Sequence, residues 1–230
     1  WPRRAAGSHL VGMGFALLAL AVAGQWDGLP VAVGWIGLAV AAAAAARWLD
    51  QPVGSGVAAT LAVLAFLQLF GRSLIERPDS DPAFTGAWSA TWYALMAGAA
   101  ACARWARTRR DAVVAWVVAG AGLWLGGSLE LYRLFDLRGA ALAGDLAISA
   151  WWVLYAGALV RLGFALGHKA VRVAGLVLAG VAAAKIVLYD LANLEALYRV
   201  GSFFVLALIT LAVAYAYHKR STEAKRLTRV

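Results

Sequence analysis

The sequence predicts an all-α integral membrane protein, a bundle of about eight transmembrane helices built from repeated helix hairpins. Of the 230 residues, 63% are hydrophobic and 14% are charged, with a mean hydropathy of +0.74, whereas a soluble domain carries roughly 25% charged residues. The apolar stretches are about 16 to 22 residues long, close to the ~20 residues that cross a ~30 Å hydrocarbon layer as a helix. The solvent around this chain is therefore a lipid bilayer.

The apolar segments are predicted to be helices because backbone amides in hydrocarbon must find their hydrogen bonds within the chain. The segments are rich in Ala, Leu and Gly and lack the period of two that barrel strands require. Polar or Pro-containing breaks separate them, and no proline interrupts a predicted span. Taken in order, the expected helices lie near residues 9–24, 30–48, 53–71, 84–106, 112–130, 142–163, 170–189 and 196–217.

Prolines and polar residues mark the ends of several predicted helices. Pro30 and Pro52 fall in or next to a first turn, where a missing amide hydrogen is harmless, and Pro78 and Pro82 fall in a polar connection.

We treat residues 1–230 as a single transmembrane domain. Because the chain starts at Trp1 rather than Met and has no signal peptide, we expect it to be the C-terminal portion of a longer chain.

The charges separate when the connections are assigned alternately to two sides of the membrane. One side holds both termini and the loops near residues 50, 108 and 167, and it carries 15 of the 21 Lys and Arg residues but three of the 12 acidic residues. The other side carries six basic and nine acidic residues. Positively charged loops resist translocation, so we expect the basic side, with both termini, to face the cytoplasm of a bacterial inner membrane.

The surplus of nine positive charges could also indicate nucleic-acid binding. Its placement in loops and in the tail from His218 to Val230 favours contacts with membrane lipids instead, and we expect no nucleic-acid partner.

A pattern of Trp and Arg repeats along the chain. Trp35, Arg47 and Trp48 recur as Trp92, Arg104 and Trp105, each displaced by 57 residues, and a looser third copy starts at Trp152. Helix hairpins repeated in the same orientation would be parallel repeats about an axis along the membrane normal. The alternative is the general preference of Trp and Arg for membrane interfaces.

The densest group of unlike charges is expected at the periplasmic face, and it is the candidate functional site. Glu130, Arg133 and Asp136 follow the fifth predicted helix, while Lys185, Asp190, Glu195 and Arg199 lie between the seventh and the eighth. Lys185 is about four residues inside its span, so its ammonium must reach the headgroups or have a partner. One interpretation is an anchoring network of ion pairs; the other is a site that binds a headgroup or sugar, or that relays protons.

Local roles are available for part of this group. Glu195 and Arg199 have the spacing and order of a helical ion pair, and Asn193 can cap the last helix.

Gly122 and Gly126 form a G-x-x-x-G step followed by Gly127, which predicts close packing of another helix, with a hinge as the alternative.

Motifs for catalysis or cofactor binding are absent from the sequence. His9, His168 and His218 are isolated, so no metal site is predicted, and the single Cys102 excludes an intrachain disulfide. There is no nucleophile elbow, phosphate loop or dinucleotide fingerprint, so we expect no cofactor, and enzymatic activity is the weaker hypothesis.

The segment from Leu146 to Lys219 resembles the C-terminal end of a bacterial membrane family called domain of unknown function 2339. The similarity is carried by a Trp-containing helix, by Arg172 and Gly175, and by two further groups of residues: Lys185, Asp190, Leu194, Tyr198, Arg199, Ser202 and Phe203, then Tyr215 and Tyr217. The closing motif departs from the family pattern of Tyr-Gln-Arg, since this chain has Tyr217, His218 and Lys219. The resemblance implies a long inner-membrane protein with many helices and with no assigned activity.

Three functions remain open on these grounds. The leading hypothesis is a multi-pass scaffold or assembly component of the bacterial cell envelope, without catalysis of its own and in contact with other membrane proteins of a larger complex. The first alternative is a transporter or flippase of a lipid-linked or small polar solute, although unbroken helices are unlike those of many transporters. The second is a membrane transferase acting at the periplasmic face.

Overall fold

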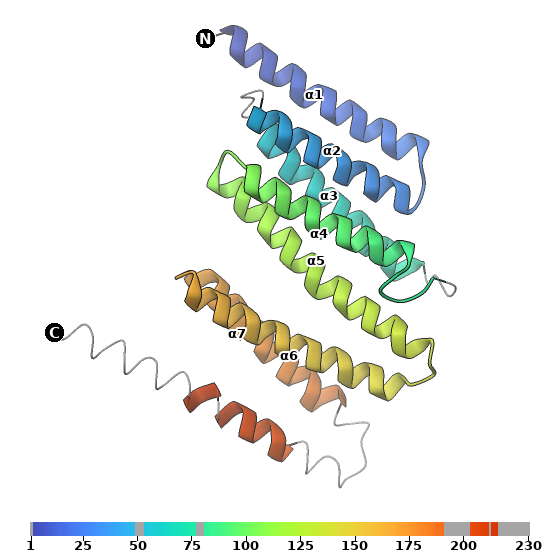
Figure 1. The fold of residues 1–230 in the computed structure, drawn as a ribbon, viewed down its shortest axis with the longest axis vertical. Helices are drawn as coiled ribbons and strands as arrows, with labels where there is room; N and C mark the ends of the chain where they lie inside the picture. Colours follow the sequence, from blue (N-terminus) through green and yellow to red (C-terminus); the bar gives the residue numbers. More distant parts are fainter. Residues whose placement is uncertain (1, 49–52, 77–80, 191–202, 212, 216–230) are drawn as a thin grey trace, which may run out of the picture. The chain divides into compact units, whose positions relative to one another are not determined.

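The computed structural model describes residues 2–48, 53–76, 81–190, 203–211 and 213–215, with side chains from residue 10 onward. Within these ranges the chain is helical with no β-strand, which confirms the predicted all-α class (Figure 1). The chain divides into an N-terminal unit, Trp1–Trp151, and a C-terminal unit, Trp152–Val230. Each unit is described by itself below, and the single transmembrane domain stays a prediction.

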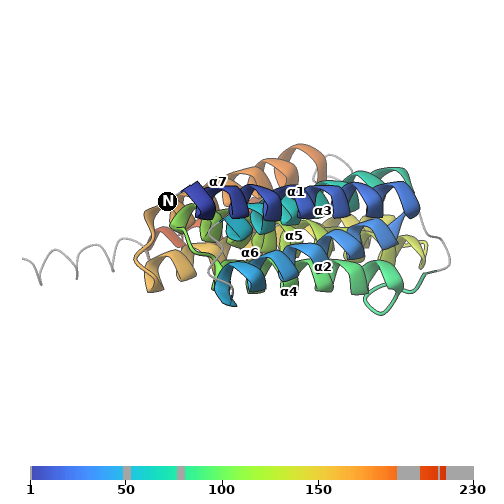
Figure 2. The ribbon, with the colours of Figure 1, turned by 90° about the horizontal axis from the view of Figure 1, so that it is seen from above.

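The N-terminal unit contains five complete helices and the first part of a sixth. They are α1 (Pro2–Gln25), α2 (Leu29–Trp48), α3 (Val53–Ile75), α4 (Ala87–Trp105), α5 (Arg109–Asp136) and the start of α6 (Ala141–Ala165). Helix α2 packs on α3 and α4, α5 packs on the same two helices, and α1 packs on α2 and α3 (Figure 2). The result is a layered bundle in which α3 contacts each of the helices α1, α2, α4 and α5.

The C-terminal unit is a helix hairpin with a further helical segment. Helix α7 (Lys169–Lys185) follows the end of α6 and continues into a π-helical turn, η1 (Ile186–Asp190). A Cβ atom at Gly175 would lie 2.9 Å from the carbonyl oxygen of Ala156, so the glycine allows the two backbones to approach. Residues 203–211 and 213–215 are helical and belong to the eighth predicted segment.

Among the residues that the structure describes, five helices are long and apolar enough to cross a membrane: α2, α3, α5, α6, and α7 together with η1. Helix α4 is not one of them, and its sequence is less apolar because it contains Ser89, Thr91, Tyr93, three Trp residues and Arg104. The described apolar parts of the first and eighth segments, Leu10–Gln25 and Phe203–Tyr215, are shorter.

Large apolar side chains cover much of the molecular surface. Leu17, Leu154 and Val177 are each more than 60% exposed, as are several other Leu and Val residues. A soluble monomer rarely exposes so much contiguous apolar area, and hydrocarbon is the solvent that matches it. The fold is therefore that of a multi-pass helical membrane protein.

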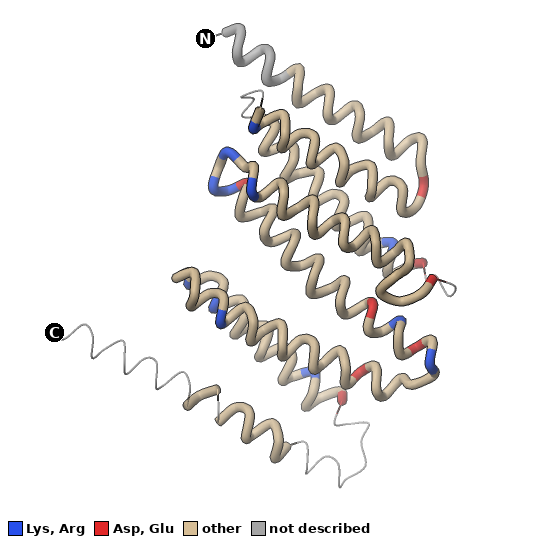
Figure 3. The backbone as a smooth tube through the Cα atoms, in the orientation of Figure 1, with Lys and Arg blue, Asp and Glu red and all other residues tan. Residues whose placement is uncertain are grey.

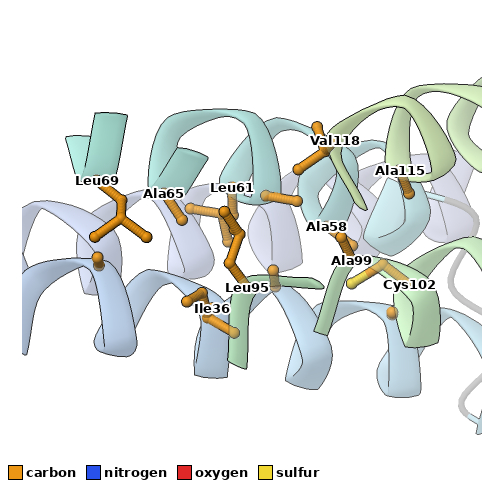
Figure 4. Packing of buried hydrophobic residues seen from close by; sticks show 14 of the residues in the cluster. Ile36, Ala58, Leu61, Ala65, Leu69, Leu95, Ala99, Cys102, Ala115 and Val118 are labelled. Carbon is orange, nitrogen blue, oxygen red and sulfur yellow. The ribbon is translucent and has the colours of Figure 1, made fainter. Parts of the chain in front are cut away.

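Small residues hold the helices of the N-terminal unit close together. Ala42, Ala43 and Ala46 of α2 have no exposed surface, and a Cβ atom at Gly54 of α3 would lie 2.6 Å from the carbonyl oxygen of Ala42. Such close backbone contact gains dispersion energy where lipid removes the hydrophobic driving force. Larger side chains such as Leu61, Leu69 and Leu95 fill the space that remains (Figure 4).

The predicted glycine step lies against aromatic side chains. Cβ atoms at Gly122 and Gly126 of α5 would lie 3.3 Å from Met96 and 3.1 Å from the Trp92 ring of α4. Gly127 faces the other way, and a Cβ atom there would lie 2.8 Å from the ring of Trp151 on α6. The three glycines thus make room for one aromatic ring on each side of α5.

The predicted end of the fifth helix at residue 130 was wrong. Helix α5 continues to Asp136, because Glu130 and Arg133 sit one turn apart and form an ion pair at 3.2 Å, so charged residues do not end the helix there. Three members of the candidate site therefore lie on α5 rather than in the following connection.

Enlarging Gly54 tests the close contact between α2 and α3. We expect Gly54→Leu to lower the free energy of unfolding by roughly 1–3 kcal/mol, the usual range for overpacking a helix contact. The control is Gly71→Leu on the same helix, where an added Cβ atom meets open space. Thermal denaturation of the purified full chain in mild detergent measures both, and an equal loss in the two variants would contradict the packing described.

Candidate functional site

The N-terminal unit encloses the carboxylate of Glu130 at its predicted periplasmic end, more fully than the charges of Asp81 and Arg133 beside it. The Glu130 side chain is 3% exposed. One carboxylate oxygen, Oε2, accepts a hydrogen bond from the backbone amide of Phe84 at 2.7 Å, and Oε1 accepts one from the Nη1 atom of Arg133 at 3.2 Å. Both oxygens of this buried carboxylate are satisfied, as burial requires.

Arg133 connects this carboxylate to the segment that precedes α4. Its Nη2 atom donates a hydrogen bond to the backbone carbonyl of Asp81 and lies 3.5 Å from the Oδ2 atom of the same residue. The guanidinium therefore bridges Glu130 on its own helix and Asp81, which is 52 residues earlier in the chain.

Asp81 in turn caps helix α4. Its two carboxylate oxygens accept hydrogen bonds from the backbone amides of Ala87 and Trp88, both at 3.0 Å. Burial acts to raise the pKa of the Asp81 carboxyl, but these hydrogen bonds and the charge of Arg133 outweigh it, so the pKa lies below its ordinary value. Asp81 is thus an ionised cap over the positive end of the α4 dipole.

The short segment between Asp81 and Gly86 is shaped by these contacts. Phe84 has a φ of 64°, in the left-handed region that residues other than glycine rarely adopt. Its carbonyl accepts a hydrogen bond from the Tyr93 hydroxyl at 3.2 Å. The Asp81 carboxylate can lie against residue 86 because this residue is a glycine; a Cβ atom at Gly86 would overlap the carboxylate. Glu130, Tyr93 and Asp81 together hold a strained backbone in one conformation.

A small cavity of about 210 Å³ opens beside the network. Its walls include Glu130 and Arg133 with the exposed Asp136 from α5, the rings of Trp88 and Trp92 from α4, and Glu76, which directly follows α3. Glu76 forms an ion pair with Arg72. The lining is aromatic and net acidic, and the volume lies below the roughly 300–1,000 Å³ of typical ligand pockets.

The other described part of the candidate site is an ion pair in the C-terminal unit. The Nζ atom of Lys185 lies 2.8 Å from the Oδ1 atom of Asp190, whose side chain is 0% exposed. The Lys185 ammonium also lies 5.4 Å from the centre of the Tyr189 ring. This pair supplies the partner that the position of Lys185 required.

The π-helical turn brings Lys185 and Asp190 together. Residues five apart on an α-helix point in directions about 140° apart at 3.6 residues per turn, whereas the wider π turn, with bonds from residue i to i+5, brings their directions much closer together. Because Ile186–Asp190 is π-helical, the ammonium and the carboxylate meet on one face. The ion pair and the backbone irregularity therefore depend on each other.

The seven predicted site residues are distributed as follows. The N-terminal unit brings together Glu130 and Arg133, with Asp136 on the same cavity wall, and the C-terminal unit brings together Lys185 and Asp190. Glu195 and Arg199, like Asn193, lie outside the described residues. Asp81 and Phe84 belong to the network but were not predicted; the signal available was Asp81 itself, a possible helix cap close before the fourth apolar segment.

The opposite end of the N-terminal unit has its own polar contacts. The Ser55 hydroxyl donates a hydrogen bond to the Oδ2 atom of Asp111 at 2.6 Å, and Arg107 donates one to the carbonyl of Ala46 at 2.9 Å. Among the residues of this unit from 10 onward that the structure describes, five arginines and one aspartate lie at this end, while the Glu130 end has three arginines and six acidic residues (Figure 3).

The fold and these buried ion pairs define the class of protein, a multi-pass α-helical membrane protein. Residues 123–220 match the family described as predicted membrane protein (DUF2339), which confirms the resemblance predicted from sequence. The match begins upstream of Leu146 and includes all seven candidate site residues. No curated protein and no solved structure matches the chain.

The chemistry of the described site is that of fixed ion pairs. Across residues 10–48, 53–76, 81–190, 203–211 and 213–215, no three His, Cys, Asp or Glu side chains gather as possible metal ligands. The charged groups of the network bind each other and the backbone. These contacts fix the start of α4 against α5, and they join the end of α7 to the π turn that follows it.

Removing the Glu130 carboxylate tests this fixing role. We expect Glu130→Ala to speed hydrogen exchange of the amides between residues 81 and 88 by on the order of tenfold, because an unsatisfied buried partner costs about 1–3 kcal/mol. Hydrogen-exchange mass spectrometry of the full chain measures it. Asp136→Ala, on the same cavity wall, is the control and should leave the exchange unchanged; unchanged exchange in Glu130→Ala would contradict the network.

Proposed function

We propose that the protein is a multi-pass scaffold or assembly component of the bacterial cell envelope, without catalysis of its own. The observation that carries this proposal is that the buried charged groups are bound to partners within the protein. Glu130 has both oxygens bonded, Asp81 caps a helix, and Lys185 is paired with Asp190. Groups held in this way stabilise a fixed surface and are poorly available to a substrate.

The distribution of charge supports a location in the inner membrane with both termini in the cytoplasm. The end with Arg47, Arg104, Arg107, Arg109 and Arg110 would be cytoplasmic and the Glu130 end periplasmic, as the retention of positive loops requires. The arginines of this end are exposed, and each lies where it can meet phospholipid headgroups.

The repeated pattern supports a modular design for such a scaffold. Arg47 and Arg104 occupy the last turns of α2 and α4, and the rings of Trp48 and Trp105 are in contact with their centres 5.9 Å apart. Corresponding positions of two hairpins thus meet at the same end, as parallel repeats about an axis along the membrane normal would place them. The exposed small and apolar faces would receive lipids and other membrane proteins.

One observation favours a second candidate, a transporter or flippase of a lipid-linked or small polar solute. The cavity beside Glu130 combines carboxylates, a guanidinium and Trp rings, which are groups that bind polar solutes. Against this candidate, the cavity is small and its buried charges already have partners.

Replacing the C-terminal ion pair separates the two candidates. Lys185→Met leaves Asp190 buried without its ammonium, at a cost of roughly 3–5 kcal/mol, so the full-length protein should fall in abundance. Lys185→Met combined with Asp190→Leu removes both charges and should recover much of that abundance. Quantitative immunoblotting of membranes measures each variant.

The same strains report function through their sensitivity to detergents and osmotic shock. If the protein is a scaffold, envelope integrity should follow the abundance of the protein, so the double variant should behave like the unaltered protein. A double variant at normal abundance that fails to support envelope integrity would contradict the anchoring role and favour the transporter.

A further inference from the structure

An apolar groove of about 790 Å³ runs between α1 and α3. Its walls include Phe15 and Ala19 of α1 and Gly56, Thr60 and Leu64 of α3, and Trp35 of α2 also lines it. These positions recur at helical spacing, so each helix turns one face to the groove. In a bilayer such a groove is open to acyl chains.

Trp35 keeps the groove in place. Its indole N–H group donates a hydrogen bond to the carbonyl oxygen of Ala19 at 2.9 Å, which ties α1 to α2. At Gly56 an added Cβ atom would meet no atom within 4 Å, so this stretch of α3 leaves space rather than packing against α1. The groove is therefore a feature that the side chains hold open.

One end of the groove lies at the basic end of the N-terminal unit. Asp111, which lines the groove, is held by the Ser55 hydroxyl at 2.6 Å. Arg109 and Arg110 are exposed and directly precede it, and Arg47, Arg104 and Arg107 lie at the same end (Figure 3). The groove thus reaches the end of the unit that carries these five arginines, and Arg109 and Arg110 are the two that adjoin a residue of its lining, Asp111.

We propose that this groove holds an acyl chain of an anionic phospholipid whose phosphate lies against Arg109 and Arg110. The apolar walls match the chain, and the arginine excess matches a headgroup with net negative charge. Asp111 repels phosphate, so the headgroup sits on the exposed arginines rather than within the groove. This inference needs only the membrane location of the chain and does not depend on the scaffold role.

Two variants test the two parts of the lipid. Gly56→Leu fills the groove, and Gly37→Leu is its matched control, because Gly37 also has open space around it but lies on α2 outside the groove. Arg109→Gln combined with Arg110→Gln removes the two headgroup contacts and leaves the groove intact.

Native mass spectrometry of the full chain, titrated with phosphatidylglycerol or with phosphatidylcholine of the same acyl chains, measures binding. We expect tighter binding of phosphatidylglycerol, a loss on the order of tenfold in Gly56→Leu, and none in Gly37→Leu. The double arginine variant should bind the two lipids equally, because each cation near an anionic headgroup contributes to the preference.

Three outcomes would overturn the proposal. They are equal binding of the two lipids by the unaltered chain, unchanged phosphatidylglycerol binding in Gly56→Leu, and a Gly56→Leu variant that loses a dimer rather than a lipid, which would make a second copy the occupant. Thermal denaturation of the Gly56→Leu and Gly37→Leu variants checks that both fold equally well.

Discussion

The constraint on which this structure depends is that hydrocarbon offers no hydrogen bonds, so every polar group must reach the two ends of the bundle or find a partner within the chain. Backbone groups meet it by forming helices. The hydroxyls of Thr60, Ser73, Thr91 and Ser128 meet it by donating to carbonyls one turn earlier. The buried charges meet it as pairs, Glu130 with Arg133 and Lys185 with Asp190.

The same constraint explains why packing relies on small residues. Since lipid is as apolar as a leucine side chain, the helices gain little by excluding solvent and much by close contact. Ala42, Gly54 and Gly126 provide that contact between neighbouring helices. Where the contact opens, between α1 and α3, the space is lined by apolar atoms and becomes a place for lipid.

Sequence reasoning located the helical segments because hydrophobic length is a property of neighbouring residues. It failed to extend the fifth helix because charged residues usually end an apolar run, whereas Glu130 and Arg133 neutralise each other within the helix. It missed Asp81 and Phe84 as parts of the site because their partners are about fifty residues away, a distance over which spacing carries no signal. The π turn was not predicted either. The sequence indicated that Lys185 reaches the headgroups or has a partner, and the partner, Asp190, lies at the end of this turn.

The claim that the two polar ends face opposite sides of the membrane is tested most directly by thiol labelling. With Cys102 replaced by Ala, single cysteines replace two exposed arginines, Arg110 at the basic end and Arg138 beyond α5 at the acidic end. A reagent that cannot cross the inner membrane should label Arg138→Cys in intact cells and Arg110→Cys only after that membrane is opened. Labelling of Arg110→Cys in intact cells, or of both cysteines from the same side, would contradict the account.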